Sequence, residues 1–192
     1  MKNNKGILFT LISLGALFYF FANFQRIAIP GAVFDLLQQE LAVSAPYITA
    51  FGAIFMYLYA VNQLIIGVLV DRYGGLRVML TGGIILGLGA LLFPISTNLP
   101  LMYFSRVLVG VGGSCFYLSL IRELREYFSD KNFGIAISVM LCIGYCGGIA
   151  ANAPFVFMMK YMNWRTILVI LALIILAGVL LFIIPIKHEG DV

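Results

Sequence analysis

Two arginines, Arg26 and Arg106, lie within or at the edge of long apolar stretches of the chain. A guanidinium group is planar and offers its N–H donors in a fork that matches an anionic group. A charge near the middle of a lipid bilayer costs about 2.5 to 3.5 kcal/mol on insertion scales, so such a residue usually faces a bundle interior or a wet cavity. Both arginines are therefore candidate contacts for an anionic solute.

Arg106 follows Asn98, the predicted start of its helix, by eight residues. At 1.5 Å per residue it lies about 12 Å along that helix, close to the middle of a bilayer. Gly110, Gly113 and Tyr117 share its face at helical spacing, which leaves room beside the guanidinium. An internal clamp to backbone carbonyls or to a neighbouring helix explains a buried arginine equally well.

Arg26 lies about 28 Å along a helix that starts at Ile7, near the interface where a long basic side chain reaches water. If the helix continues past Pro30, Arg26 moves inward. Tyr19 and Asn23 share its face. Solute contact and an ordinary interfacial position both remain open.

Two further pairs of polar residues could complete a solute-binding cavity. Tyr59 and Asn62 lie on the second apolar stretch, and Tyr145 and Asn152 lie on the fifth. Each pair is at helical spacing and so faces one way. Hydrogen bonds between packed helices would explain these residues equally well.

The same stretches offer little for catalysis or metal binding. They hold no Asp or Glu, and there is no phosphate loop and no metal-ligand cluster, so we expect no enzyme activity, no cofactor and no metal. Cys115, Cys142 and Cys146 are expected to behave as small hydrophobes, and a soft-metal path through the last two is the less favoured alternative. Two candidate positive charges and no negative ones favour an anion as solute, and a coupling acid would have to come from elsewhere.

Composition sets the elements that must position these residues. The 192 residues are 62% hydrophobic and 10% charged, with a mean hydropathy of +1.06, which is too apolar for a soluble domain to bury. We predict one all-α domain over residues 1–192, an integral membrane bundle of six helices. The predicted spans are about Ile7–Ile29, Pro46–Val70, Val78–Phe93, Leu99–Leu120, Phe133–Met159 and Trp164–Ile186. Side-chain caps from Ser44, Asn98 and Asn163 are expected at three helix starts, with Pro94 closing the third span.

Basic residues near span ends resist translocation, so the side with more of them is cytoplasmic. Eight lie on one side of the six predicted spans: Lys2, Lys5, Arg72, Arg77, Arg122, Arg125, Lys131 and Lys187. Lys160 and Arg165 lie on the other. We predict a multi-pass protein of the cytoplasmic membrane with both termini in the cytoplasm. The net charge of +4 is spread singly over short loops, so we expect no nucleic-acid partner.

The loop after the second span carries an acid, bases and glycines at defined spacing: Gly67, Asp71, Arg72, Gly74 and Arg77. Glycine permits a tight turn, arginines hold the loop inside, and Asp71 can face a helix amino terminus. A charged stop signal would explain the arginines but not the spacing of the acid and the glycines.

This loop resembles the signature loop of the major facilitator superfamily, and Arg106 with Gly110, Gly112 and Gly113 is similar to the second motif of that family. The resemblance implies the amino-terminal half of a twelve-helix fold that transports a solute by alternating access. It also implies that the five loop residues gate the cytoplasmic side against a second half. The antiporter signature is incomplete in Gly144–Gly148, where the proline is missing, so a symporter or uniporter is favoured.

A faint repeat supports two inverted triplets of helices. Tyr73–Leu80 and Tyr161–Leu168 share Tyr, Arg and Leu at matching positions, and they lie on opposite sides of the predicted membrane. The segment Arg122–Lys131 mixes charges at helical spacing, which favours a solvated loop or a short helix on the inner surface.

The implied function needs a second six-helix unit in the lipid bilayer. That unit could be another copy of the chain, a separately encoded protein, or a carboxyl half that would follow Lys187–Val192. The alternative is a non-transporting sensor or assembly partner that keeps the half-fold.

Overall fold

The computed structural model describes residues 5–189, and over that range the chain is an all-helical bundle. The helices are α1 (Lys5–Ala28), α2 (Phe34–Leu41), α3 (Ala45–Tyr73), α4 (Gly75–Ile95), α5 (Leu99–Tyr127), α6 (Asp130–Ala150), α7 (Ala153–Met158) and α8 (Trp164–Glu189). In this part of the chain, six helical segments are long and apolar enough to cross a membrane, with α6 and α7 together forming the fifth. The predicted all-α membrane bundle is confirmed. Lys2 and the end of the predicted tail lie outside the described residues.

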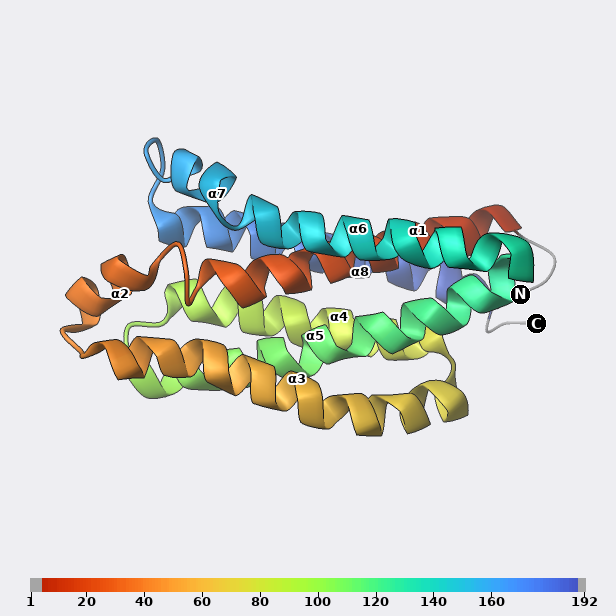
Figure 1. Ribbon diagram of the computed structural model, residues 1–192, viewed down its shortest axis with the longest axis horizontal. Helices are drawn as coiled ribbons and strands as arrows, with labels where there is room; N and C mark the ends of the chain where they lie inside the picture. The colour runs from red at the N-terminus through yellow and green to blue at the C-terminus, as the bar shows by residue number, and fades with distance from the viewer. Residues whose placement is uncertain (1–4, 190–192) are drawn as a thin grey trace.

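The long helices run side by side, with α2 and α7 at one end (Figure 1). α1 packs against α5 and α6, α5 also packs against α3, and α4 packs against α5 and α8. The order α6–α1–α5–α3 therefore forms one layer, and α8–α4 forms the other. The first triplet of spans is α1, α3 and α4, and the second is α5, α6 with α7, and α8. If the two triplets are exchanged, the packed pair α1–α6 becomes the packed pair α5–α3. The inverted repeat itself stays a prediction.

Glycine allows these helices to approach closely. A side chain at Gly112 of α5 would collide with the backbone nitrogen of Leu86 in α4, and one at Gly147 of α6 would collide with the carbonyl oxygen of Phe20 in α1. Small residues at helix interfaces are the usual means of close packing in membranes. The glycines of the fifth span thus have a packing role here.

Polar side chains cap two of the three helix starts that the sequence indicated. Asn98 Oδ1 accepts a hydrogen bond of 2.9 Å from Leu101 N, and Asn163 Oδ1 accepts one of 2.8 Å from Arg165 N. These two predictions are confirmed. Ser44 precedes α3 in the N-cap position, but its hydroxyl makes no capping hydrogen bond, so that prediction is wrong.

Two helix ends need comment. The fifth predicted span is crossed by two helices, because α6 ends at Ala150 and α7 begins at Ala153, directly before Pro154, although together they form one candidate span, Asp130–Met158. Proline lacks an N–H and its ring crowds the preceding turn, which interrupts the helix. The segment from Arg122 is not a separate surface helix, because α5 continues unbroken to Tyr127.

We name the two ends of the bundle by their residues. The basic end, where α3 and α5 end and α4 and α6 begin, carries Arg72, Arg77, Arg122, Arg125 and Lys131, and the α2 end lies opposite (Figure 1).

Candidate solute groove and gating loop

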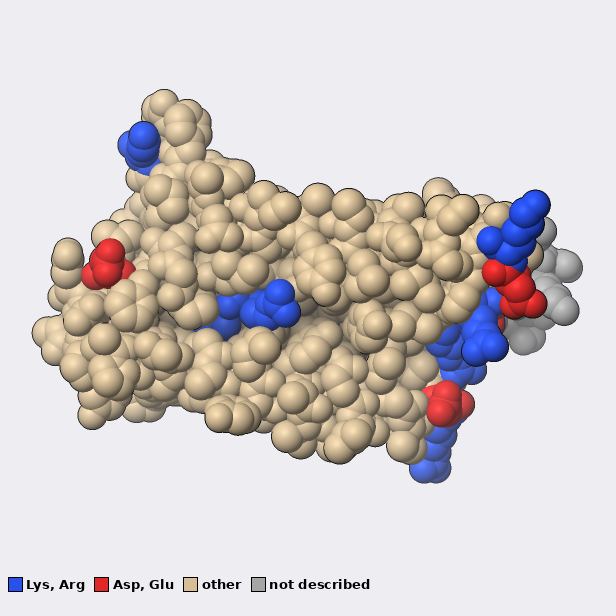
Figure 2. Space-filling model, in the orientation of Figure 1, with Lys and Arg blue, Asp and Glu red and all other residues tan. Residues whose placement is uncertain are grey.

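One face of the bundle is hollowed midway along its length. Figure 1 identifies the walls as α1 and α6 on one side and α3 and α5 on the other. Figure 2 shows basic atoms in this hollow, well away from the charged side chains that gather at the basic end. We refer to this hollow as the groove.

Arg26 lies in the last turn of α1 and is half-buried. The two ion pairs of the described residues join Arg122 to Glu126 and Arg165 to Glu40, so Arg26 pairs with no carboxylate there. The α1 helix ends at Ala28, before Pro30, so the helix does not carry Arg26 further inward. Its guanidinium is therefore available to an anion.

Tyr19 and Tyr59 lie near this arginine. Tyr59 stacks on Phe55 with ring centroids 5.9 Å apart, and it lies within electrostatic range of Tyr19, Tyr145 and Arg26. The rings of Tyr19 and Tyr117 are 6.3 Å apart. Three of the six predicted solute contacts, Arg26, Tyr59 and Tyr145, are thus brought together from three different helices.

Tyr19 and Tyr117 join this cluster although neither was a predicted solute contact. Tyr19 is buried, and Asn23 Nδ2 donates 2.9 Å to its backbone oxygen. The spacing from Tyr19 to Arg26 is seven residues, two helical turns, so the shared face was the signal that could have identified it.

The two predicted asparagines have different surroundings. Asn62 Nδ2 is buried and has no hydrogen-bond partner among the described residues, one helical turn from Tyr59 on α3. Asn152 lies in the break between α6 and α7, where its Nδ2 donates 2.8 Å to Gly148 O. Asn152 therefore caps the end of α6 in this structure.

Arg106 lies inside the bundle, with no exposed surface. Its Nε donates 3.3 Å to the backbone oxygen of Phe51, and its guanidinium carbon is 5.4 Å and 5.9 Å from the ring centroids of Phe55 and Phe93. A Cβ at Gly110 would lie 3.2 Å from Leu58 Cβ, so this glycine brings α3 close. The prediction of free space beside the guanidinium is therefore wrong, because Phe55 and Phe93 lie there. A solute contact for Arg106 stays a prediction.

A cavity of about 620 Å³ lies between α1, α5 and α6. Its lining is almost wholly apolar, with Phe9, Ile12, Leu124 and Met140 and only Ser13 and Asn132 as polar side chains. None of the predicted solute contacts lines it. This apolar cavity and the predicted solute contacts are therefore in different places.

The loop at the basic end is a single-residue connection. α3 ends at Tyr73 and α4 begins at Gly75, so Gly74 alone joins them, with φ of 88° and ψ of 150°. That backbone conformation is open to glycine and strained for other residues. The predicted glycine turn is confirmed.

The charged residues of this loop project outward. Asp71, Arg72 and Arg77 are exposed, and the Arg72 guanidinium lies 5.3 Å from the Tyr73 ring centroid. Gly67 is one helix turn before Asp71, and a Cβ there would meet only Leu118, at 3.9 Å. Exposure leaves these charges free to meet another surface.

Two neighbouring residues of α5 hold this loop, and sequence reasoning missed both. Glu123 is buried, and its Oε1 accepts 3.2 Å from Leu76 N in the first turn of α4. Arg122 Nη1 donates to Val70 O in the last turn of α3. An acid at a helix start and a base at a helix end both match the helix dipole. It is Glu123, and not Asp71, that meets the amino terminus of α4.

Glu123 also corrects the expectation that no acid lies within a span. It is part of the continuous α5 helix and is only 3% exposed. In the sequence Glu123 lies among charged neighbours, four residues before Tyr127, and such a pattern also suits a solvated segment. For that reason the predicted span ended before it.

A sequence model of the Major Facilitator Superfamily matches residues 13–191. A protein named probable sulfoacetate transporter, from Cupriavidus necator, is 20% identical over 181 residues, which cover 94% of this chain and 42% of that protein. The 3-(3-hydroxy-phenyl)propionate transporter of Escherichia coli is 31% identical over 106 residues, which cover 55% of this chain and 26% of that protein. The chain thus spans less than half the length of these curated relatives. Because the family match extends over most of the chain, it is a multi-pass membrane protein that belongs to the major facilitator superfamily.

Proposed function

We propose that the chain forms one half of a secondary transporter that moves a small organic anion across the cytoplasmic membrane by alternating access. The observation that carries this proposal is Arg26, a half-buried arginine without a carboxylate partner among the described residues, near Tyr19 and Tyr59 of a tyrosine cluster drawn from α1, α3, α5 and α6. The names of the two relatives support it, since sulfoacetate and hydroxyphenylpropionate are both organic anions.

The groove suits an anionic head group on a small organic body. Arg26 offers a planar fork of donors to a carboxylate or sulfonate. Tyr59 and Tyr145 present rings to an apolar part and hydroxyls to a polar one. Asn62 Nδ2, which lacks a partner among the described residues, supplies a further donor one turn along α3.

A second six-helix unit completes the route. A groove that holds Arg26 and several tyrosine hydroxyls is costly to expose to lipid, because hydrocarbon offers these groups no hydrogen bonds. The least buried spans are α3 and the fifth span, α6 with α7, and these flank the groove. We assign them to the contact with the second unit, which is another copy, a separate chain or a carboxyl half.

The gating residues act at the basic end. We place that end and both termini in the cytoplasm, because basic residues near span ends resist translocation. Asp71, Arg72 and Arg77 are exposed there and can meet the second unit when the groove closes on that side. Gly74 permits the tight turn, while Arg122 and Glu123 hold that turn on α5. Gly67 faces Leu118 of α5 and stays a predicted gating residue.

Binding of two anions tests the proposal without an assembled transporter. Sulfoacetate and 3-(3-hydroxyphenyl)propionate are added to the detergent-solubilised chain, and the thermal midpoint is recorded against concentration. We expect one or both to raise the midpoint, and Arg26→Ala to weaken that binding at least about tenfold, because a charge-assisted hydrogen bond is lost. 3-(3-Hydroxyphenyl)propionamide, the neutral amide of the second acid, serves as the matched control and should have no effect.

Unchanged binding in Arg26→Ala would exclude Arg26 from the site. A shift of equal size with the neutral amide would remove the argument for an anion.

A further inference from the structure

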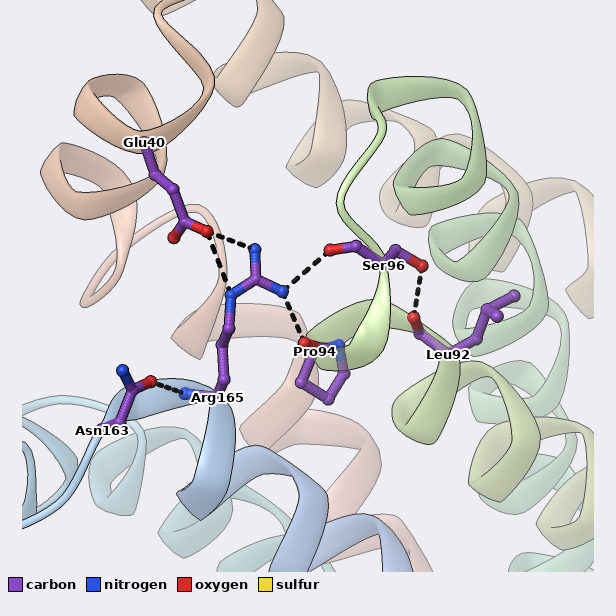
Figure 3. Close-up of polar contacts among 6 residues, drawn as sticks. All are labelled: Glu40, Leu92, Pro94, Ser96, Asn163 and Arg165. Atoms are coloured by element: carbon purple, nitrogen blue, oxygen red, sulfur yellow. Dashed lines mark hydrogen bonds and ion pairs between the residues drawn. The ribbon is translucent and has the colours of Figure 1, made fainter.

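The α2 end of the bundle holds a second arginine cluster, built around Arg165 at the start of α8. Figure 3 shows its guanidinium between Glu40 of α2 and the Pro94–Ser96 turn that ends α4. Arg165 Nη1 donates to the carbonyl oxygens of Pro94 and Ser96, the latter at 2.8 Å. Nη2 and Nε donate to Glu40 Oε1 at 2.7 Å and 3.2 Å. Three segments far apart in the sequence therefore meet on one side chain.

The start of α8 is itself held in place. Asn163 Oδ1 accepts from the Arg165 backbone nitrogen at 2.8 Å, and the guanidinium lies 4.5 Å from the Trp164 ring centroid. Trp164 is buried and packs against Phe93, with ring centroids 6.4 Å apart. Arg165 thus projects from a fixed helix start.

The bonds to α4 suit a permanent joint. The last carbonyls of a helix have no intrahelical partner and carry partial negative charge, so a cation there is favourable. Pro94 and Ser96 are both buried. These contacts join the ends of α4 and α8, two helices that also pack along their length.

The bond to Glu40 differs, because it lies nearer the surface. The side chain of Glu40 is 44% exposed and that of Arg165 is 20% exposed. Partly exposed ion pairs contribute little to stability and are weakened by salt. α2 is also held by Leu37, which is fully buried beneath it, and by Phe34 and Leu41, which are partly buried and pack against the same apolar cluster.

The position of α2 connects the Glu40–Arg165 ion pair to the walls of the groove. α2 connects α1, which carries Arg26 two residues before its end, to α3, which carries Tyr59. These helices form opposite walls of the groove (Figure 1). A movement of α2 away from the bundle therefore moves the ends of both walls.

We propose that Glu40 and Arg165 form a releasable latch at the α2 end. Arg165 keeps α8 joined to α4 in both states, while the ion pair to Glu40 holds α2 down. When the pair breaks, α2 lifts and the groove widens at this end. The transport consequence rests on the proposed function, whereas the latch itself does not.

Accessibility of the side chain beneath α2 tests the latch directly. Leu37→Cys is introduced into a chain whose three native cysteines are replaced by alanine, and the protein is placed in lipid nanodiscs. The rate of modification by a membrane-impermeant maleimide is then measured. With the ion pair intact, the buried thiol introduced on α2 should react slowly. Glu40→Gln should raise its rate about two- to fivefold, the range expected for loss of a partly exposed ion pair.

Salt gives an independent reading on the same protein. About 1 M KCl should raise the rate of the chain with the intact pair toward that of Glu40→Gln, and should leave Glu40→Gln unchanged. Glu126→Gln, which removes the other described ion pair at the far end of the bundle, is the matched control and should not alter the rate.

Equal rates in the intact chain and in Glu40→Gln, at low and at high salt, would overturn the latch. If Leu37→Cys does not fold, Gln38→Cys on the same helix serves as the probe with the same expected order of rates. Because no solute is added, failure here is distinct from failure of anion binding.

Discussion

Arg26 and Arg106 show how the same side chain takes different roles in one bundle. Arg26 is half-buried at the groove, whereas Arg106 is enclosed by Phe51, Phe55 and Phe93. Its Nη1 and Nη2 have no partner among the described residues. A buried charge that is only partly satisfied does not add stability in itself. In this structure Arg106 joins α5 to α3 through the Phe51 carbonyl, and its contact with a solute stays a prediction.

Substitution of Arg106 separates its packing from its charge. Arg106→Met keeps most of the volume and should leave the thermal midpoint unchanged or higher, because no polar group is then buried unpaired. Arg106→Ala leaves a cavity beside the aromatic rings and should cost about 2 to 4 kcal/mol. Thermal unfolding of the solubilised variants measures both. Loss of anion binding in a well-folded Arg106→Met would instead assign Arg106 to the solute site.

Sequence spacing placed Arg26, Tyr59 and Tyr145 on helix faces that do meet, because helical periodicity is reliable in long apolar segments. The same reasoning could not tell whether Arg106 contacts a solute or a neighbouring helix, because the spacing of residues on one helix does not show what packs against that face. The close approach of α3 at Gly110 depends on tertiary packing, which no single-helix pattern contains.

At the scale of the elements, helix ends determine what the bundle exposes. Glu123 meets the start of α4 and Arg122 meets the end of α3, so α5 holds both sides of the Gly74 turn. The number and approximate positions of the six spans were predictable from apolar composition. The continuation of α5 past Leu120 was not, because charged residues at helical spacing suit both a loop and a helix. The break at Asn152 precedes Pro154, a signal that the sequence contains.

Removal of the Glu123 carboxylate should destabilise the α4 start. Glu123→Ala leaves the Leu76 N–H without this acceptor and should cost about 1 to 3 kcal/mol, and Glu123→Gln, which keeps an acceptor, should cost less. Glu126→Ala, on the exposed side of the same helix, is the control and should change stability by no more than about 0.5 kcal/mol. Equal thermal midpoints for Glu123→Ala and Glu126→Ala would contradict this role.

Substitution of Gly74 by alanine, which adds one methyl group, tests the turn between α3 and α4. Gly74→Ala places a side chain at φ of 88° and should cost about 1 to 3 kcal/mol. Gly134→Ala lies within α6, where a Cβ meets nothing within 4 Å, and should instead stabilise by about 0.5 to 1 kcal/mol. Thermal midpoints of the two variants should move in opposite directions. A Gly74→Ala chain as stable as the original would show that the turn has another conformation.

At the scale of the whole molecule, the proposed second unit would cover the hollowed face of the bundle within the membrane. The all-helical architecture followed from a mean hydropathy of +1.06, since no soluble core of this size could bury so much apolar surface. The identity of the cover could not be read from this chain, because interfaces between membrane helices and surfaces that face lipid are both apolar. The groove, with its basic side chains, distinguishes the face proposed for the second unit from the surfaces that face lipid (Figure 2).

Uptake of a labelled anion by the assembled transporter tests the central claim most directly. The chain is purified from its native membranes with the second unit that accompanies it, reconstituted into liposomes, and supplied with radiolabelled sulfoacetate or 3-(3-hydroxyphenyl)propionate. We expect saturable uptake of at least one anion, abolished in Arg26→Ala and partly retained in Arg26→Lys, at equal amounts of folded protein. Uptake by Arg26→Ala at the original rate would contradict the account.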